Sequence, residues 1–194
     1  MTRNQIIIVG AGVAVVVVGL FAFISLGAYN IAADAPHSRL VQDLIEYARE
    51  RSIEVRAAGI EVPNLDDPKR IAAGGAEYAE MCSSCHLAPG MERTEISQGL
   101  YPRAPELSRG IDLSAAEEFW VVKHGIKLTG MPAWGTTHDD ELLWDVVAFL
   151  QKLPTLSAAE YQAIVKSAPE SHEQMMHGDT MHEMKMEGGA GDKN

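Results

Sequence analysis

Two cysteines and a histidine near the middle of the chain are spaced for covalent attachment of a porphyrin. Cys82 and Cys85 are followed directly by His86, so the segment reads C-x-x-C-H. Thiols three residues apart on one helical turn can add to the two vinyl groups of a haem, and the adjacent imidazole can then bind the iron as its proximal ligand. The chain contains no other cysteine, so no thiol remains for a disulfide or for a second attachment.

Other uses of a C-x-x-C pair fit the surrounding sequence less well. A dithiol redox motif usually opens a helix that follows a strand in a βαβ pattern, and the flanking residues show no such pattern. A zinc site normally needs four Cys or His ligands, and the chain has no second C-x-x-C and no H-x-x-x-H. The spacing therefore favours one covalently bound haem c.

A methionine is the expected second axial ligand. An iron that only passes electrons usually has both axial positions filled, and methionine opposite histidine raises the potential. Of nine methionines, Met131 lies forty-five residues after His86, which leaves room for a loop and a helix to pass around the ring. Pro132 restricts Met131 to an extended backbone. His124 and His138 remain alternatives as the ligand, and a methionine that only fills the core remains an alternative for Met131.

The helix that leads to the cysteines is predicted over residues 68–82. Asp67 can cap it, Pro68 suits its first turn, and apolar or small residues recur three or four apart at Ile71, Gly74, Tyr78 and Met81. A glycine inside a helix costs roughly 1 kcal/mol relative to alanine. Gly74 therefore indicates that another backbone approaches closely at this point.

Two further helices are predicted downstream. Residues 114–124 begin with a capping box, Ser114-x-x-Glu117, and Gly125 is a natural C-terminal stop. Residues 139–152 begin with two aspartates, which suit the helix dipole, and end before Pro154. The apolar stripe of this last helix consists of Leu143, Val146, Val147 and Leu150.

The order of these motifs over residues 66–156 resembles class I c-type cytochromes. The motifs are Gly74-x-x-x-Tyr78, Cys82-x-x-Cys85-His86, Ala104-Pro105-Glu106-Leu107, Gly130-Met131-Pro132 and the segment 144–150. The resemblance implies a small all-α fold whose first and last helices cross at Gly74, Tyr78, Val146 and Phe149. It implies that Tyr78 and Trp134 surround the haem and that the Pro105 carbonyl accepts a hydrogen bond from the His86 ring.

One feature departs from the family pattern, and another narrows the resemblance to a subgroup. The stretch of nineteen residues from His86 to Pro105 is longer than in the shortest members of the family. The region around Trp120, Gly125 and Trp134 is similar to a subgroup found as haem subunits or soluble partners of bacterial oxidases and dehydrogenases. The resemblance thus implies redox protein partners in a respiratory complex.

The N-terminal region contains a segment that is long enough to span a membrane. Ile6 to Ala28 carries no charge, and twenty-three helical residues extend about 35 Å, against ~30 Å of hydrocarbon. Arg3 precedes the segment and places the N-terminus in the cytoplasm. A cleaved signal peptide is the alternative, but its apolar core is usually only ~7–15 residues long. We expect a retained anchor in the bacterial inner membrane, with the haem domain in the periplasm.

These observations divide the chain into four parts. Residues 1–30 are the anchor, residues 31–65 an amphipathic helix and linker, residues 66–156 the cytochrome c domain, and residues 157–194 a tail predicted to be disordered. The amphipathic helix of residues 37–58 places Leu40, Val41, Leu44, Ile45 and Ala48 on one side and ends before Gly59. The sequence leaves open whether this helix is a solvated stalk or packs on another surface.

The charge of the chain limits its partners. The net charge is −11, and residues 66–156 carry fourteen acidic and eight basic side chains. Binding to nucleic acid requires a basic face and is not expected. An acidic redox domain would be attracted to a partner with a basic docking patch, although the charge also fits ordinary solubility.

The tail contains thioethers and imidazoles, which together suit Cu(I). Its histidines are also suited to Cu(II). The candidate copper ligands are His172, Met175, Met176, His177, Met181, His182, Met184 and Met186. The alternative is a tail in which these side chains make only weak contacts.

Taken together, the sequence predicts an electron carrier, not an enzyme, with covalent haem c as its cofactor. The alternative function is copper handling, with the tail as the copper site and the haem as reductant. A haem enzyme or gas sensor would need an open iron position, which Met131 is expected to fill.

Overall fold

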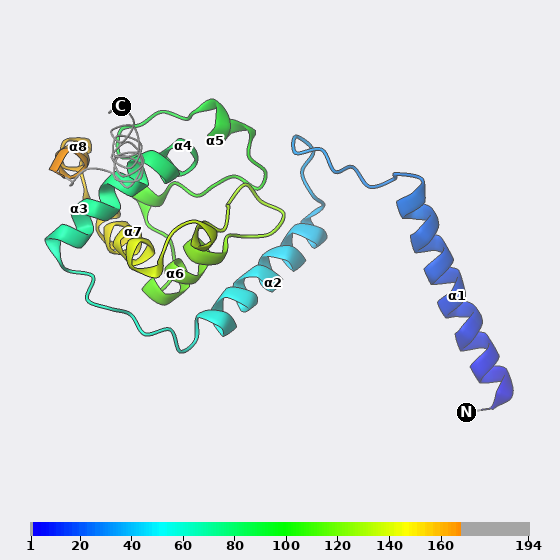
Figure 1. Ribbon diagram of the computed structural model, residues 1–194. Coiled ribbons are helices and arrows are strands. Elements are labelled where there is room, and N and C mark those ends of the chain that lie inside the picture. The colour runs from blue at the N-terminus through cyan, green and yellow to red at the C-terminus, as the bar shows by residue number, and fades with distance from the viewer. Residues whose placement is uncertain (1, 168–194) are drawn as a thin grey trace, which may run out of the picture. The chain divides into compact units, whose positions relative to one another are not determined.

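The computed structural model describes residues 2–167, which form two compact units that meet at Pro36 and His37. The regular structure within these residues is entirely helical (Figure 1), as the sequence predicts. The helices of the second unit are α2 (Arg39–Ala57), α3 (Pro68–Glu77), α4 (Ser83–His86), α5 (Glu95–Gly99), α6 (Ala115–His124), α7 (Asp140–Lys152) and α8 (Ala158–Ser167), with a π-helical turn η1 (Tyr78–Cys82) and 3-10 turns η2 (Leu107–Arg109), η3 (Trp134–Thr136) and η4 (Leu153–Thr155).

The first unit contains one helix, α1 (Arg3–Ser25). A capping box between Thr2 and Gln5 starts the helix before the uncharged segment, and the chain turns at Gly27, which has a φ of +62°. The mean hydropathy of its central window is 2.9 and its side chains are exposed. Among the described residues, α1 is the one helix that is long and apolar enough to cross a membrane.

The crossing of α3 and α7 organises the core of the second unit. A Cβ on Gly74 would lie 1.8 Å from the carbonyl oxygen of Asp145, so the two backbones touch at this point. The side chains around the crossing are almost fully buried, with exposures of at most 1% for Tyr78, Leu143, Val146, Val147 and Phe149. The close approach predicted from Gly74 is therefore what the structure shows.

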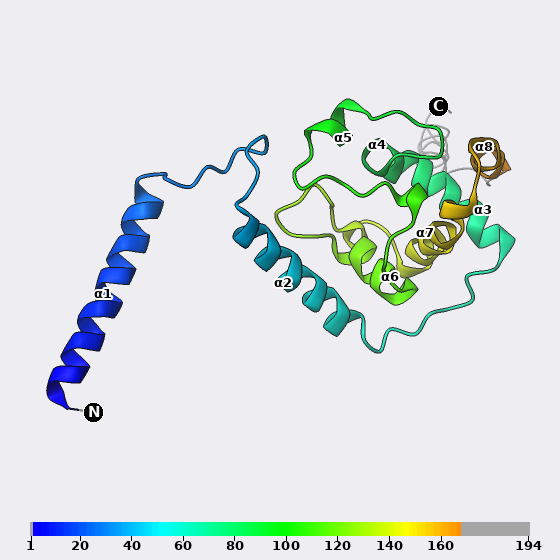
Figure 2. The ribbon, with the colours of Figure 1, turned by 180° about the vertical axis from the view of Figure 1, so that it is seen from behind.

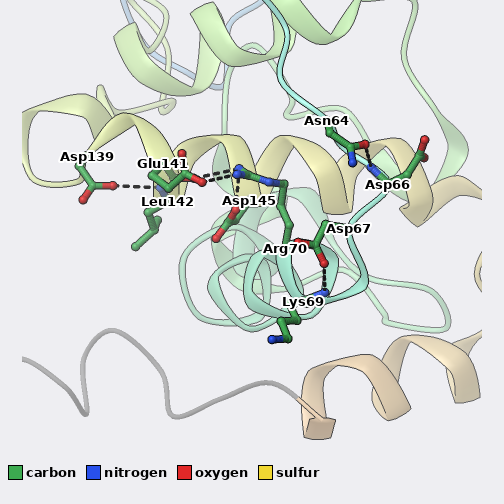
Figure 3. Close-up of polar contacts among 9 residues, drawn as sticks. All are labelled: Asn64, Asp66, Asp67, Lys69, Arg70, Asp139, Glu141, Leu142 and Asp145. Atoms are coloured by element: carbon green, nitrogen blue, oxygen red, sulfur yellow. Dashed lines mark hydrogen bonds and ion pairs between the residues drawn. The ribbon is translucent and has the colours of Figure 1, made fainter.

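An ion-pair cluster at the edge of this crossing joins the same two helices (Figure 3). Arg70 on α3 reaches Glu141 and Asp145 on α7, with 2.7 Å between Arg70 Nη1 and Asp145 Oδ1. Burial raises the pKa of Asp145 to about 6, and the Arg70 guanidinium opposes that rise. The partly buried pair fixes the rotation of α3 against α7.

Helix α2 packs against α6, so residues 39–57 are part of the folded unit. Its buried residues are Ile53 and Ala57, near its C-terminal end. The stripe predicted from sequence is largely exposed instead, at 78% for Leu40 and 66% for Leu44. The helix was predicted correctly, and it contacts the domain through a different face from the one that the apolar pattern favoured.

The folded unit extends beyond residue 156, where the domain was predicted to end. Helix α8 lies beside α3 and α7 (Figure 2) and contacts α3 directly. Its Tyr161 is 4% exposed and packs against Tyr78, with 6.4 Å between the ring centroids. The segment predicted as a tail from residue 157 therefore includes helix α8, and the candidate copper ligands all lie outside the described residues.

Candidate haem-binding site

The cysteine motif lies at the end of one continuous helical segment. Asp67 caps α3 by accepting from the Lys69 N–H at 2.9 Å, and the helix continues through the π-helical turn η1 into α4. The sequence predicted an unbroken α-helix over 68–82, whereas the last five of those residues form a π-helical turn and helical structure continues to His86. Such wide turns often occur at functional sites.

Hydrogen bonds fix the turn that carries the two thiols. The Thr94 hydroxyl donates to the carbonyl of Ser84, between the cysteines, and the Ser83 hydroxyl donates to the Ala79 carbonyl at 2.7 Å. The buried Tyr78 hydroxyl donates to the carbonyl of Leu87, where the chain leaves the helix with a φ of +61°. Tyr78 therefore supports the motif from the core.

The ring of His86 is held by a backbone carbonyl. Its Nδ1 lies 2.9 Å from the Pro105 oxygen, the contact that the sequence resemblance implies. A carbonyl can only accept, so Nδ1 carries the proton and donates. Burial lowers the pKa of His86, although this hydrogen bond opposes the shift. A neutral ring with its proton on Nδ1 leaves Nε2 as the nitrogen that can bind a metal.

Both cysteines are free thiols and both are half-buried. Burial raises the pKa of Cys82 to about 12, with smaller contributions from Glu77 and Cys85. A thiol that stays protonated is a poor thiolate nucleophile or metal ligand. The described residues also hold no group of three or more His, Cys, Asp or Glu side chains placed to bind a metal ion. The burial of Cys82 and the absence of such a group among the described residues both argue against a zinc site at this pair.

Met131 follows a short loop that begins where α6 ends. Gly125 caps α6 with a φ of +63°, and a Cβ there would lie 2.7 Å from the Met131 carbonyl oxygen. The Ile126 N–H donates to that same oxygen at 3.2 Å, and the Met131 N–H donates to the Thr129 hydroxyl at 3.0 Å. Hydrogen bonds therefore hold the backbone on both sides of the Met131 side chain.

The family comparison covers this whole arrangement. A model of the family described as cytochrome c oxidase, cbb3-type, subunit III matches residues 69–150, from the start of α3 to the end of α7. The matched residues are a class I c-type cytochrome domain. A comparison with curated proteins gives no match to the chain. The cytochrome domain implies haem c as cofactor and haem-based electron transfer as its chemistry.

The side chains of the cytochrome domain fit this cofactor. Cys82, Met131 and Trp134 are half-buried and pack against the same core cluster, so the thioether and a cysteine approach one core from different parts of the chain. Together with Cys85 and His86, Cys82 and Met131 would supply the two thiols, the imidazole and the thioether that covalent attachment and His/Met ligation require. The fit rests on the types of these side chains and on the packing of Cys82, Met131 and Trp134 against one core.

The alternative histidine ligands have other contacts. His138 lies 5.7 Å from the Trp134 ring, measured between centroids, and its ring Nδ1 lies 2.8 Å from the Thr137 hydroxyl oxygen. His124 is exposed at the end of α6, beside Trp120. Met131, in contrast, is directed into the packed region. This placement favours the methionine that the sequence predicted.

Sequence reasoning did not identify two groups of the cytochrome domain that position the site. Thr94 bonds the cysteine turn, and it also caps α5 by accepting from the Ser97 N–H at 3.0 Å. That T-x-x-S pattern is a local capping signal and could have predicted α5. Tyr101 contacts His37, just before α2, and no local pattern indicates this contact.

Proposed function

We propose that the chain is a membrane-anchored electron carrier of the bacterial periplasm, or a haem subunit of a respiratory complex, with one haem c bound at Cys82 and Cys85. The observation that carries the proposal is the C-x-x-C-H turn of a cytochrome domain whose histidine Nδ1 donates to the Pro105 carbonyl at 2.9 Å. When bound, the haem supplies a reversible one-electron couple at its iron.

Residues of the chain would bind the haem and set its reduction potential. Cys82 and Cys85 attach the ring, and Pro105 orients the imidazole of His86 as one axial ligand. Met131 is the other axial ligand, which raises the potential and leaves no open position for a substrate. The buried Tyr78 supports the attachment turn, and Trp134, which packs against the same core cluster as Met131, limits access of water. This division of roles describes a carrier rather than an enzyme.

The anchor and the charge support the proposed location and partners. Helix α1 has the length and hydropathy of a membrane span, and Arg3 at its start favours a cytoplasmic N-terminus. The haem domain would then lie in the periplasm. Its excess of acidic side chains favours a redox partner with a basic docking patch. The matching family is named for an oxidase subunit, which supports a partner within a respiratory complex.

Copper handling is the second candidate function, and its support is the composition of the tail. Thioethers and imidazoles recur within residues 172–186, so three or four soft ligands could surround one Cu(I). Ordering the backbone costs roughly 1–2 kcal/mol per residue, so the affinity should be lower than that of a preformed site.

One comparison separates the two functions. The full chain and a variant that lacks residues 170–194 should both stay in carbonate-washed membranes. Their haem should be reduced by respiratory substrates and reoxidised at equal rates. Only the full chain should retain copper after dialysis against a weak chelator. Equal copper in both proteins would exclude the tail as a copper site, and a truncation that slows haem turnover would contradict the carrier as the primary role.

A further inference from the structure

The stretch between the cysteine motif and Pro105 connects parts of the fold that lie far apart in the sequence. We propose that Leu100 and Tyr101 tie helix α2 to the loop that presents Met131, so that α2 acts as a positioning element for that loop. The proposal rests on the proposed function in one respect, which is that Met131 is an iron ligand. The contacts themselves are independent of that assignment.

The first contact joins Tyr101 to His37, which lies two residues before the first residue of α2. The backbone N–H of His37 donates to the Tyr101 hydroxyl oxygen at 2.8 Å. The two rings also pack edge to face, with 5.2 Å between their centroids and an angle of 70° between their planes. Sixty-four residues separate the partners, so this contact closes a large segment of chain.

The second contact joins Leu100, the neighbour of Tyr101, to the Met131 loop. A Cβ built on Gly130 would lie 2.4 Å from Leu100 Cδ2, so the leucine side chain rests directly on the Gly130 backbone. Gly130 is bonded to Met131. The position of the leucine therefore limits how far the peptide before the methionine can move away from the core.

The contacts form a closed circuit around the loop. Helix α2 packs on α6 and buries Ile53 and Ala57 near its own C-terminal end, and a Cβ on Gly125 at the α6 cap would touch the carbonyl of Met131. From the other side, the residues just before α2 reach the Met131 loop through Tyr101 and Leu100. Four residues after Tyr101, the Pro105 carbonyl holds His86. The segment 100–105 thus contacts the loop before Met131, the ring of His86 and the residues that precede α2.

This circuit gives the long stretch before Pro105 a role. If α2 were released from Tyr101, the Met131 loop would keep its internal hydrogen bonds but lose the leucine that rests on it. The loop would then open more often. The net contribution of one neutral hydrogen bond corresponds to roughly a two- to tenfold change in the population of the opened state.

The test uses the full-length haem-loaded protein and the variants Tyr101→Phe and Leu100→Ala. Hydrogen exchange at the Ile126 amide reports loop opening directly, because this N–H donates to the Met131 carbonyl. We expect exchange to be roughly two- to tenfold faster in Tyr101→Phe, and faster still in Leu100→Ala. Tyr47→Phe removes a hydroxyl from a 65% exposed tyrosine on α2 and should change nothing.

Amides in the centre of α7, such as that of Phe149, serve as the reporter of global unfolding and should keep their wild-type exchange rates. Unchanged exchange at Ile126 in both variants would overturn the proposal, as would equal acceleration at Ile126 and Phe149. The comparison of amide exchange between variants tests the tie whether or not Met131 binds iron.

Binding of cyanide to the ferric haem is a separate measurement. Its rate should rise together with the rate of Ile126 exchange. Faster amide exchange without faster cyanide binding would support the tie and would contradict Met131 as the ligand.

Discussion

Gly74→Ala is expected to destabilise the haem domain strongly and to lower the yield of folded protein. The new Cβ would lie 1.8 Å from the carbonyl oxygen and 2.4 Å from the carbonyl carbon of Asp145. Both are backbone atoms of α7, so no side-chain rotation relieves the overlap and the two helices must separate. Overpacking of this kind costs roughly 1–3 kcal/mol or more, against a typical stability of ~5–15 kcal/mol. The separation also opens the core around Tyr78 and Phe149, which places the cost at or above the top of that range.

The measurement is the melting temperature and the yield of haem-loaded protein. Gly99→Ala is the matched control, because nothing lies within 4 Å of its added Cβ and it ends the exposed helix α5. That control should differ from wild type by at most ~1 kcal/mol. Wild-type yield and melting of Gly74→Ala would show that α3 and α7 do not cross as described.

Removing both thiols is expected to abolish covalent attachment of the haem. In Cys82→Ala together with Cys85→Ala, no other cysteine in the chain can form a thioether. Haem staining after denaturing electrophoresis should disappear in the double variant and weaken in each single variant. Ser84→Ala keeps the carbonyl that accepts the Thr94 hydrogen bond. It removes only a 3.9 Å contact of the Ser84 hydroxyl with Cys85 Sγ, so it should stain fully. Full staining of the double variant would remove the basis for a haem c at this site.

The helix ends that local chemistry specifies could be predicted from the sequence. Ser114 and Glu117 form the expected capping box, and Asp67 and Asp139 cap the starts of α3 and α7. Gly74 also indicated the close crossing, because a glycine inside a helix needs a steric reason. These signals lie within a few residues of the structure that they determine, so no tertiary information is needed to interpret them.

The remaining features depend on contacts between distant segments. The apolar stripe of α2 predicted one buried face, but the contact with α6 buries Ile53 and Ala57 instead. Helix α8 did have local signals, namely a Ser157–Glu160 capping box and apolar residues spaced for its inner face at Tyr161 and Ile164. The prediction of a tail from residue 157 followed instead the Met- and His-rich composition of the residues after α8. The π-helical turn before Cys82 has no sequence signature that the pattern of apolar residues can detect.

The most direct test of His/Met ligation is the weak near-infrared absorption band that arises from sulfur bound to ferric low-spin haem. We expect this band in the ferric full-length protein. We expect it to be lost in Met131→Ala, with haem still attached at Cys82 and Cys85. Met91→Ala, which changes a 41% exposed methionine close to the motif, should keep the band. A band that persists unchanged in Met131→Ala would contradict the assignment of Met131 as the axial ligand and, with it, the closed-site electron carrier proposed for this chain.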